Sequence, residues 1–163
     1  MTDHIIWHAM DVMHARLVAI TAGSSHQYGA YNFTPAVVFK GRIYMSAGTE
    51  ATADQFPAYG ITAEPVEPQS YTQGGSGYTA EVSITVTARY EITDYTDQDR
   101  AGWQCVADIT AAILIRRRGR ETLDGIVTEL QLESQIVGVS PEDQTGMATI
   151  TFLARLSRAA GQP

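Results

Sequence analysis

Strict alternation of apolar and polar residues over positions 80–92 constrains the fold more than any other feature of the chain. Apolar side chains occupy every second position: Val82, Ile84, Val86, Ala88, Tyr90 and Ile92. The positions between them hold charged or hydroxyl side chains. Because successive side chains of a β-strand point to opposite faces, the pattern predicts one long strand with a covered face and an open face.

Two later segments, residues 126–137 and 147–157, alternate in the same way. In the first, the residues expected to share one face are Ile126, Thr128, Leu130, Leu132, Ser134 and Ile136. In the second, those expected on the covered side are Ala148, Ile150, Phe152, Ala154 and Leu156. Strands of this kind form a sheet with one face packed against other elements.

Two helices are expected to provide the cover. The first spans about residues 3–20, with an apolar stripe of Ile6, Met10, Met13, Leu17 and Ile20. The second spans residues 97–118, where Thr96-Asp97-Gln98-Asp99 resembles a capping box and Gly119 marks the end. Its predicted buried stripe is Trp103, Val106, Thr110, Ile113 and Leu114.

The middle of the chain is less regular. Residues 36–45 are rich in β-forming side chains, and the pair Lys40-Gly41 within them fits either a hairpin turn or a bulge. Residues 46–78 contain prolines and a glycine-rich run without sustained periodicity. We expect a long irregular arm or hairpin projecting from the sheet.

These patterns predict an α+β fold: a mixed, mostly antiparallel sheet flanked by two main helices. The chain has 163 residues, 44% of them hydrophobic and 18% charged, which is the range of a single domain covering residues 1–163. Residues 159–163 are expected to be a flexible tail. The chain shows neither a basic leader at its start nor a run of 18 apolar residues, so we expect no association with a membrane.

Few residues suggest chemistry. His4, His8 and Asp11 share one side of the first helix and could bind a divalent ion, as in a metal-dependent hydrolase. The alternative, which we favour, is the solvated side of an amphipathic helix. Cys105 has no second cysteine to pair with and is expected to be a packed thiol. We therefore predict no catalytic residues, no metal and no cofactor, and expect that the protein is not an enzyme.

The basic residues Arg116, Arg117, Arg118 and Arg120 form one cluster after the second helix. Part of the cluster complements the helix dipole. The rest could pair with acids of a neighbouring subunit or contact a phosphate backbone, and we favour subunit pairing because no aromatic residues are interleaved with the arginines. The other candidate residues for a subunit or partner interface are Glu129, Glu133, Tyr59, Tyr71 and Tyr78. A net charge of −7 argues against tight binding to nucleic acid and would suit a surface past which DNA slides.

The order of these elements resembles a known family. The passage AEVSITVTARYEITDYTDQDRAGWQCVADITAAIL, followed by a glycine and a closing pair that ends GMATITFLARLSR, is similar to tail-terminator (tail-completion) proteins of long-tailed bacteriophages. The resemblance implies a structural virion protein that forms a ring, expected to be a hexamer, on the end of the tail tube. It also implies that the ring joins the tube to the head–tail connector.

The partners implied are copies of the chain, the tail-tube protein, the head–tail connector and DNA passing through the lumen without sequence-specific binding. The expected location is the virion neck, after synthesis in the host cytoplasm. Three alternatives remain open: another head–tail adaptor or a tail-tube protein, a small metal-dependent hydrolase, and a monomeric module that binds a peptide or glycan.

Overall fold

The structure, a computed structural model, describes residues 2–41, 55–71, 77–94, 96–115, 120–140 and 144–159. Within these ranges the side chains of residues 2–4, 65–71, 77–79, 140 and 157–159 lie outside the description. The elements in chain order are α1 (Thr2–Val18), β1 (Ser25–His26), β2 (Gly29–Ala30), β3 (Val37–Lys40), β4 (Ala58–Tyr71), β5 (Gly77–Glu91), α2 (Arg100–Ile113), β6 (Glu129–Ser140) and β7 (Thr145–Ala159).

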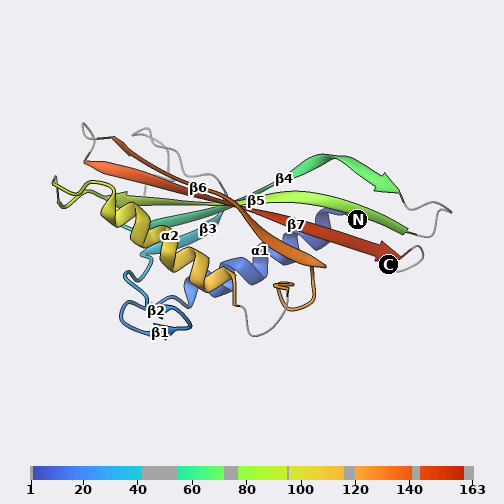
Figure 1. The fold of residues 1–163 in the computed structure, drawn as a ribbon, viewed down its shortest axis with the longest axis horizontal. Coiled ribbons are helices and arrows are strands. Elements are labelled where there is room, and N and C mark those ends of the chain that lie inside the picture. Colours follow the sequence, from blue (N-terminus) through green and yellow to red (C-terminus); the bar gives the residue numbers. More distant parts are fainter. Residues whose placement is uncertain are drawn as a thin grey trace.

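Five strands form one sheet in the order β3-β4-β5-β7-β6, and β1 pairs with β2 in a separate small hairpin. Every pair in the large sheet is antiparallel except β3 with β4, which is parallel. Both helices lie on the same side of this sheet (Figure 1). The predicted α+β class is therefore confirmed. Neither α1 nor α2, the helices of the described residues, has the length and apolar character needed to cross a bilayer.

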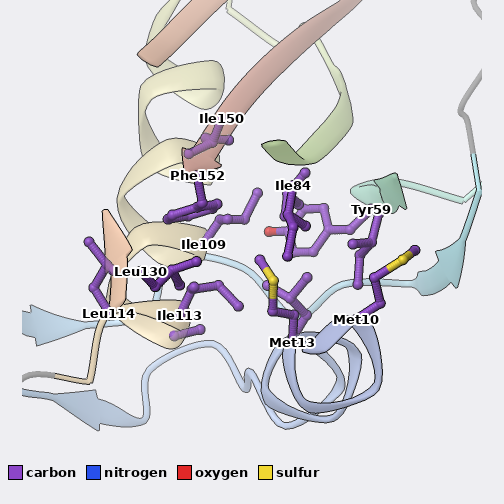
Figure 2. Packing of buried hydrophobic residues seen from close by; sticks show 14 of the residues in the cluster. Met10, Met13, Tyr59, Ile84, Ile109, Ile113, Leu114, Leu130, Ile150 and Phe152 are labelled. Atoms are coloured by element: carbon purple, nitrogen blue, oxygen red, sulfur yellow. The ribbon is translucent and has the colours of Figure 1, made fainter. Parts of the chain in front are cut away.

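The core lies between the helices and the covered face of the sheet. All the apolar positions predicted for β5 and β7 are buried, as are Met10, Met13, Leu17 and Ile20 of the predicted stripe, with α1 ending at Val18. Figure 2 shows Met10 and Met13 of α1 and Ile109 and Ile113 of α2 directed toward sheet residues such as Ile84, Ile150 and Phe152. Removing this apolar area from water is the main stabilising contribution.

The predicted covered face of β6 is correct at Leu130, which is buried, but not at Leu132, which is 37% exposed. The strand runs from Glu129 to Ser140, and its register with β7 shifts between Leu132 and Ser134. One extra residue at such a bulge moves all later side chains to the opposite face. Ile136, predicted to share a face with Leu130, is therefore 62% exposed, whereas Leu130 is buried.

The expected irregular arm contains a regular strand. Residues 58–71 form β4, which pairs with β5 as a long hairpin, so an irregular conformation throughout residues 46–78 is wrong. β3 pairs only with residues 58–61 of β4, and the prolines Pro65 and Pro68 lie on the part of β4 that β3 does not reach. Proline is tolerated at such an edge because its missing amide proton is not needed there. Residues 42–54 and 72–76 lie outside the described residues. The prediction of either a hairpin turn or a bulge at Lys40-Gly41 therefore depends on residues that are not described.

Helix α2 is shorter than predicted, and its predicted buried stripe is confirmed at Val106, Ile113 and Leu114 but not at Trp103. It begins at Arg100 after Asp99, whose side chain makes no capping hydrogen bond, so the predicted capping box does not form. Asp94 instead accepts hydrogen bonds from the backbone and side chain of Thr96, ahead of the helix. Trp103, predicted to be buried, is 50% exposed.

Tyr90 sits where α2, β6 and β7 meet, and two glycines make room for it. A Cβ atom on Gly102 would lie 2.6 Å from the Tyr90 hydroxyl, and one on Gly146 would overlap the Tyr90 ring. The hydroxyl donates a 3.4 Å hydrogen bond to the carbonyl oxygen of Gly138. The close approach of helix and sheet therefore depends on these glycines.

Gly146→Ala is expected to destabilise the protein by about 1–3 kcal/mol, because the added methyl group must displace a ring buried in a packed core. Gly138→Ala is the matched control: it lies in the neighbouring strand, and its added Cβ would meet only a backbone oxygen at 4.0 Å. Urea denaturation of both variants measures the difference. Equal stability of the two variants would contradict this account of Tyr90.

Candidate functional site

Three predicted interface residues lie close to the start of β6. Arg120 is 69% exposed and its Nε lies 3.6 Å from Oε1 of Glu129, whose other carboxylate oxygen lies 3.5 Å from Arg155. Glu133 is exposed and accepts a 3.3 Å hydrogen bond from Ser83. Arg120 and Glu129 thus interact within one chain. Ion pairs near the surface contribute roughly 0–1 kcal/mol, so both groups can exchange partners at low cost.

The predicted tyrosines have different surroundings. Tyr59 is fully buried in the core, so the prediction that it belongs to a surface for contacts is wrong for the described chain. Tyr71 and Tyr78 are paired residues of β4 and β5, and their side chains lie outside the described part of the structure. Arg116, Arg117 and Arg118 lie entirely outside the described part of the structure.

A hollow of about 380 Å³ lies at the start of α2. Its apolar lining comes from distant segments: Phe33, Phe56, Pro57, Ile92 and Ala101. Its charged residues are Glu91, Asp94, Asp97 and Arg100, which gives three carboxylates against one guanidinium. The hollow therefore combines apolar walls with a rim of net negative charge.

Hydrogen bonds from the Thr96 hydroxyl and amide lower the pKa of Asp94, one of these carboxyl groups, below its ordinary value. Asp97 and Glu91 are exposed to solvent. This acidic rim, defined as Glu91, Asp94 and Asp97, suits a ligand that carries positive charge beside an apolar group.

Asp108 positions the Phe33 wall of the hollow. Its carboxylate is fully buried on α2 and accepts hydrogen bonds from the backbone amides of Asn32 and Phe33 at 2.9–3.0 Å. The Asn32 side chain donates a further bond of 2.8 Å to the same carboxylate. One buried acid thus fixes the loop between β2 and β3 against the helix, as buried charges require such partners.

A second hollow, of about 490 Å³, lies on the other side of this loop. It is lined by Tyr28 of the small hairpin, Trp103 of α2 and Gln135 of β6, among other residues. Gln135 donates a 3.2 Å hydrogen bond to the Thr110 hydroxyl. Tyr28 and Trp103 are exposed there, and the lining contains His26 but no Asp, Glu, Lys or Arg.

Asp11, one of the three residues of the possible metal site on α1, has another partner. Asp11 forms an ion pair with Lys40 of β3, and this interaction lowers the pKa of its carboxyl group. Lys40 Nζ also lies 4.3 Å from the ring centroid of Trp7. Among the residues that the structure describes, no three side chains form a cluster suited to a metal ion, and the His4 side chain is not among them.

Cys105 is buried, as the sequence predicts for a packed thiol. Burial raises the pKa of its thiol to about 12 and that of Tyr90 to about 12, and also raises the pKa of Tyr59. The Cys105 thiol and the Tyr59 hydroxyl influence each other's ionisation, although the hydroxyl makes no hydrogen bond of normal geometry within the described residues. A thiol in this state is a poor nucleophile.

Stability should decrease from about pH 9 upward, since the unfolded chain then releases protons that the native core retains. The slope is about −1.4 kcal/mol per pH unit for each such group, and Cys105 is the first to contribute because its ordinary pKa is 9.0. Urea denaturation at pH 9 and pH 10 measures it. Cys105→Ala should flatten the slope over this interval, and an unchanged slope would show that the native thiol ionises normally.

Asp108→Ala is expected to lower the free energy of unfolding by about 2 kcal/mol, because it removes the buried acceptor of the hydrogen bonds that Asn32 and Phe33 donate. Asp108→Asn, which keeps one acceptor oxygen, should cost less. The control is Asp124→Asn, which removes an exposed charge bound to Arg16, keeps a side chain suited to the positive φ of this residue and should cost less than about 1 kcal/mol. Urea denaturation compares the three variants, and equal losses for Asp108→Ala and Asp124→Asn would contradict the anchoring role.

Comparison with protein-family models and with curated proteins gives no match. Among solved structures, the fold is similar to a chain of a structure described as "Virion of native gene transfer agent (GTA) particle". The two chains are 11% identical, with a TM-score of 0.47 over 74% of this chain and 78% of that chain. Similarity at this level is compatible with unrelated functions.

Proposed function

We propose that this protein is a structural protein of a tailed-phage virion, and specifically the tail terminator. Copies of the chain form a ring, expected to be a hexamer, that caps the tail tube and joins it to the head–tail connector. The supporting observation is that the passage which resembles the tail-terminator family folds as β5 followed by α2 on the covered face of one sheet.

The surfaces of the described residues support a role in assembly. β6 is the last strand of the sheet, and beyond Leu130, which bonds to Glu121, its outer edge pairs with no other described strand. Leu132 and Ile136 are exposed on this strand. A long unpaired edge with exposed apolar side chains is a surface that a second polypeptide chain stabilises by covering it.

The net charge suits a ring through which DNA passes. At −7 the chain repels the phosphate backbone at close range, which favours passage without sequence-specific binding. The partners proposed are therefore copies of the chain, the tail-tube protein and the connector, with DNA only in the lumen. The place of action is the virion neck, after synthesis in the host cytoplasm.

The test is tail-tube assembly with and without this protein. In its presence, tubes should have uniform lengths and carry a ring at one end in negative-stain electron micrographs. In its absence, lengths should be broadly distributed and ends bare. Unchanged lengths together with bare ends in both reactions would overturn the proposal.

A further inference from the structure

Within the described residues, the outer edge of β6 is the border of the sheet that best accommodates a further strand. Past Leu130, whose amide donates a hydrogen bond to the carbonyl oxygen of Glu121, this edge pairs with no described strand. At the opposite border, β3 is only four residues long and contacts α1, and the rest of β4 contains Pro65 and Pro68. Short strands and prolines disfavour the addition of a strand. Two copies of this chain that join their sheets edge to edge therefore do so through β6 of both.

Exposed apolar side chains are concentrated beside this edge. Seven large hydrophobic residues of the described chain are exposed, and four of them lie here. Leu132 and Ile136 are on β6, whereas Tyr28 and Trp103 line the second hollow together with Gln135 of β6. A concentration of exposed apolar side chains marks a surface that another polypeptide covers.

The distribution of charge along β6 selects how two copies can pair. Residues 134–139, which follow the bulge, contain no ionisable side chain. An antiparallel pairing of two β6 strands centred on Glu133 would place two carboxylates opposite each other, which is unfavourable. A pairing centred on Ile136 instead separates the two Glu133 residues by six positions, or about 20 Å along the strands. Charge and exposure thus favour the same centre.

We propose that the free chain forms a symmetric dimer in which the β6 edges of two copies pair in antiparallel orientation, with the two Ile136 residues opposite each other at the two-fold axis. Gln135 of one copy then lies opposite Val137 of the other. The backbone groups of both edges gain partners, and the exposed Ile136 side chains are removed from water. Because this axis is perpendicular to the sheet, the helices of both copies lie on the same side of the joined sheet (Figure 1).

This inference rests on the proposed function in one respect, since both use the β6 edge for assembly. The dimer contact is isologous and is complete with two copies, so it does not extend around a ring. Neighbours in the proposed ring meet through another surface. The dimer is accordingly the form of the chain before it meets the tail tube.

The first test is a disulfide bond at the two-fold axis. Residues directly opposite each other in an antiparallel pair have Cα atoms about 4.5–5.5 Å apart, a separation that a disulfide spans. Ile136→Cys should therefore give a covalent dimer when the folded protein is oxidised under mild conditions. The unmodified chain, whose single Cys105 is buried, should remain free of cross-links.

Two further cysteine variants are controls for this cross-link. Val18→Cys, on α1, has a similar exposure to Ile136, 56% against 62%, and should not cross-link. Leu132→Cys lies on β6 itself, but it is far out of register with its counterpart in the second copy and should not cross-link either. Non-reducing electrophoresis compares the three variants.

The second test exchanges charge at the axis and measures association by sedimentation velocity. Ile136→Lys and Ile136→Glu should each weaken dimerisation at least about tenfold, because like charges face each other and an apolar contact is lost. An equimolar mixture of the two variants should associate more tightly than either alone. Val18→Lys should leave association unchanged, and circular dichroism with thermal melting confirms that each variant is folded.

The dimer is wrong if the unmodified chain is monomeric at micromolar concentrations. It is also wrong if Ile136→Cys cross-links no more than Val18→Cys, or if the mixture of Lys and Glu variants does not recover association. If the free chain is monomeric and Ile136→Lys abolishes tube capping, a strand of a different polypeptide occupies the edge and the dimer is wrong.

Tube capping separates this inference from the proposed function. If tubes are capped but no dimer forms, the dimer is wrong and the terminator role stands. If the chain dimerises with the expected cross-link but has no effect on tubes, the dimer stands and the terminator role is wrong.

Discussion

The continuous pairing of β5 with β7 is the constraint on which the rest of the structure depends. Fifteen residue pairs, from Gly77 with Ala159 to Glu91 with Thr145, succeed one another without a register shift. Since side chains alternate between faces, this uninterrupted register keeps all the apolar residues of both strands on the same side. A slip of β7 by one residue relative to β5 would turn Phe152 and the other apolar residues of β7 toward solvent and remove them from the surface on which the helices pack.

The sequence predicts the parts of the fold where periodicity is unbroken. Residues 80–92 alternate without exception and residues 147–157 do so apart from Met147 and Leu153, and the structure forms β5 and β7 there with the expected faces buried. The sequence of β6 also alternates up to its bulge. The extra residue at a bulge cannot be recognised from the sequence, and all later side chains in the strand point to the face opposite to the one predicted. The prolines in residues 58–71 made a strand there difficult to predict, because a proline in a strand is acceptable only at an edge. The sequence does not show which strands lie at edges.

The candidate site was less predictable for a related reason. The acids near the start of α2 are visible in the sequence, but the apolar walls come from Phe33 and Phe56, which only the tertiary fold brings to the helix. The partners of Asp108 include backbone amides of a loop. Every residue except proline has such an amide, so residue types do not predict which ones a buried acid will bind. The one signal in the sequence is an acid among apolar neighbours on a predicted helix, and it does not identify the segment that the acid binds.

Most of β4 forms the opposite border of the sheet from β6, and this border contains Pro65 and Pro68. A strand without amide protons at two nearby positions is a poor template for another strand, so uncontrolled fibril growth is blocked on that side. Pro65 and Pro68 thus disfavour addition of a further strand at this border, so strand-to-strand association is directed to the opposite edge of the sheet.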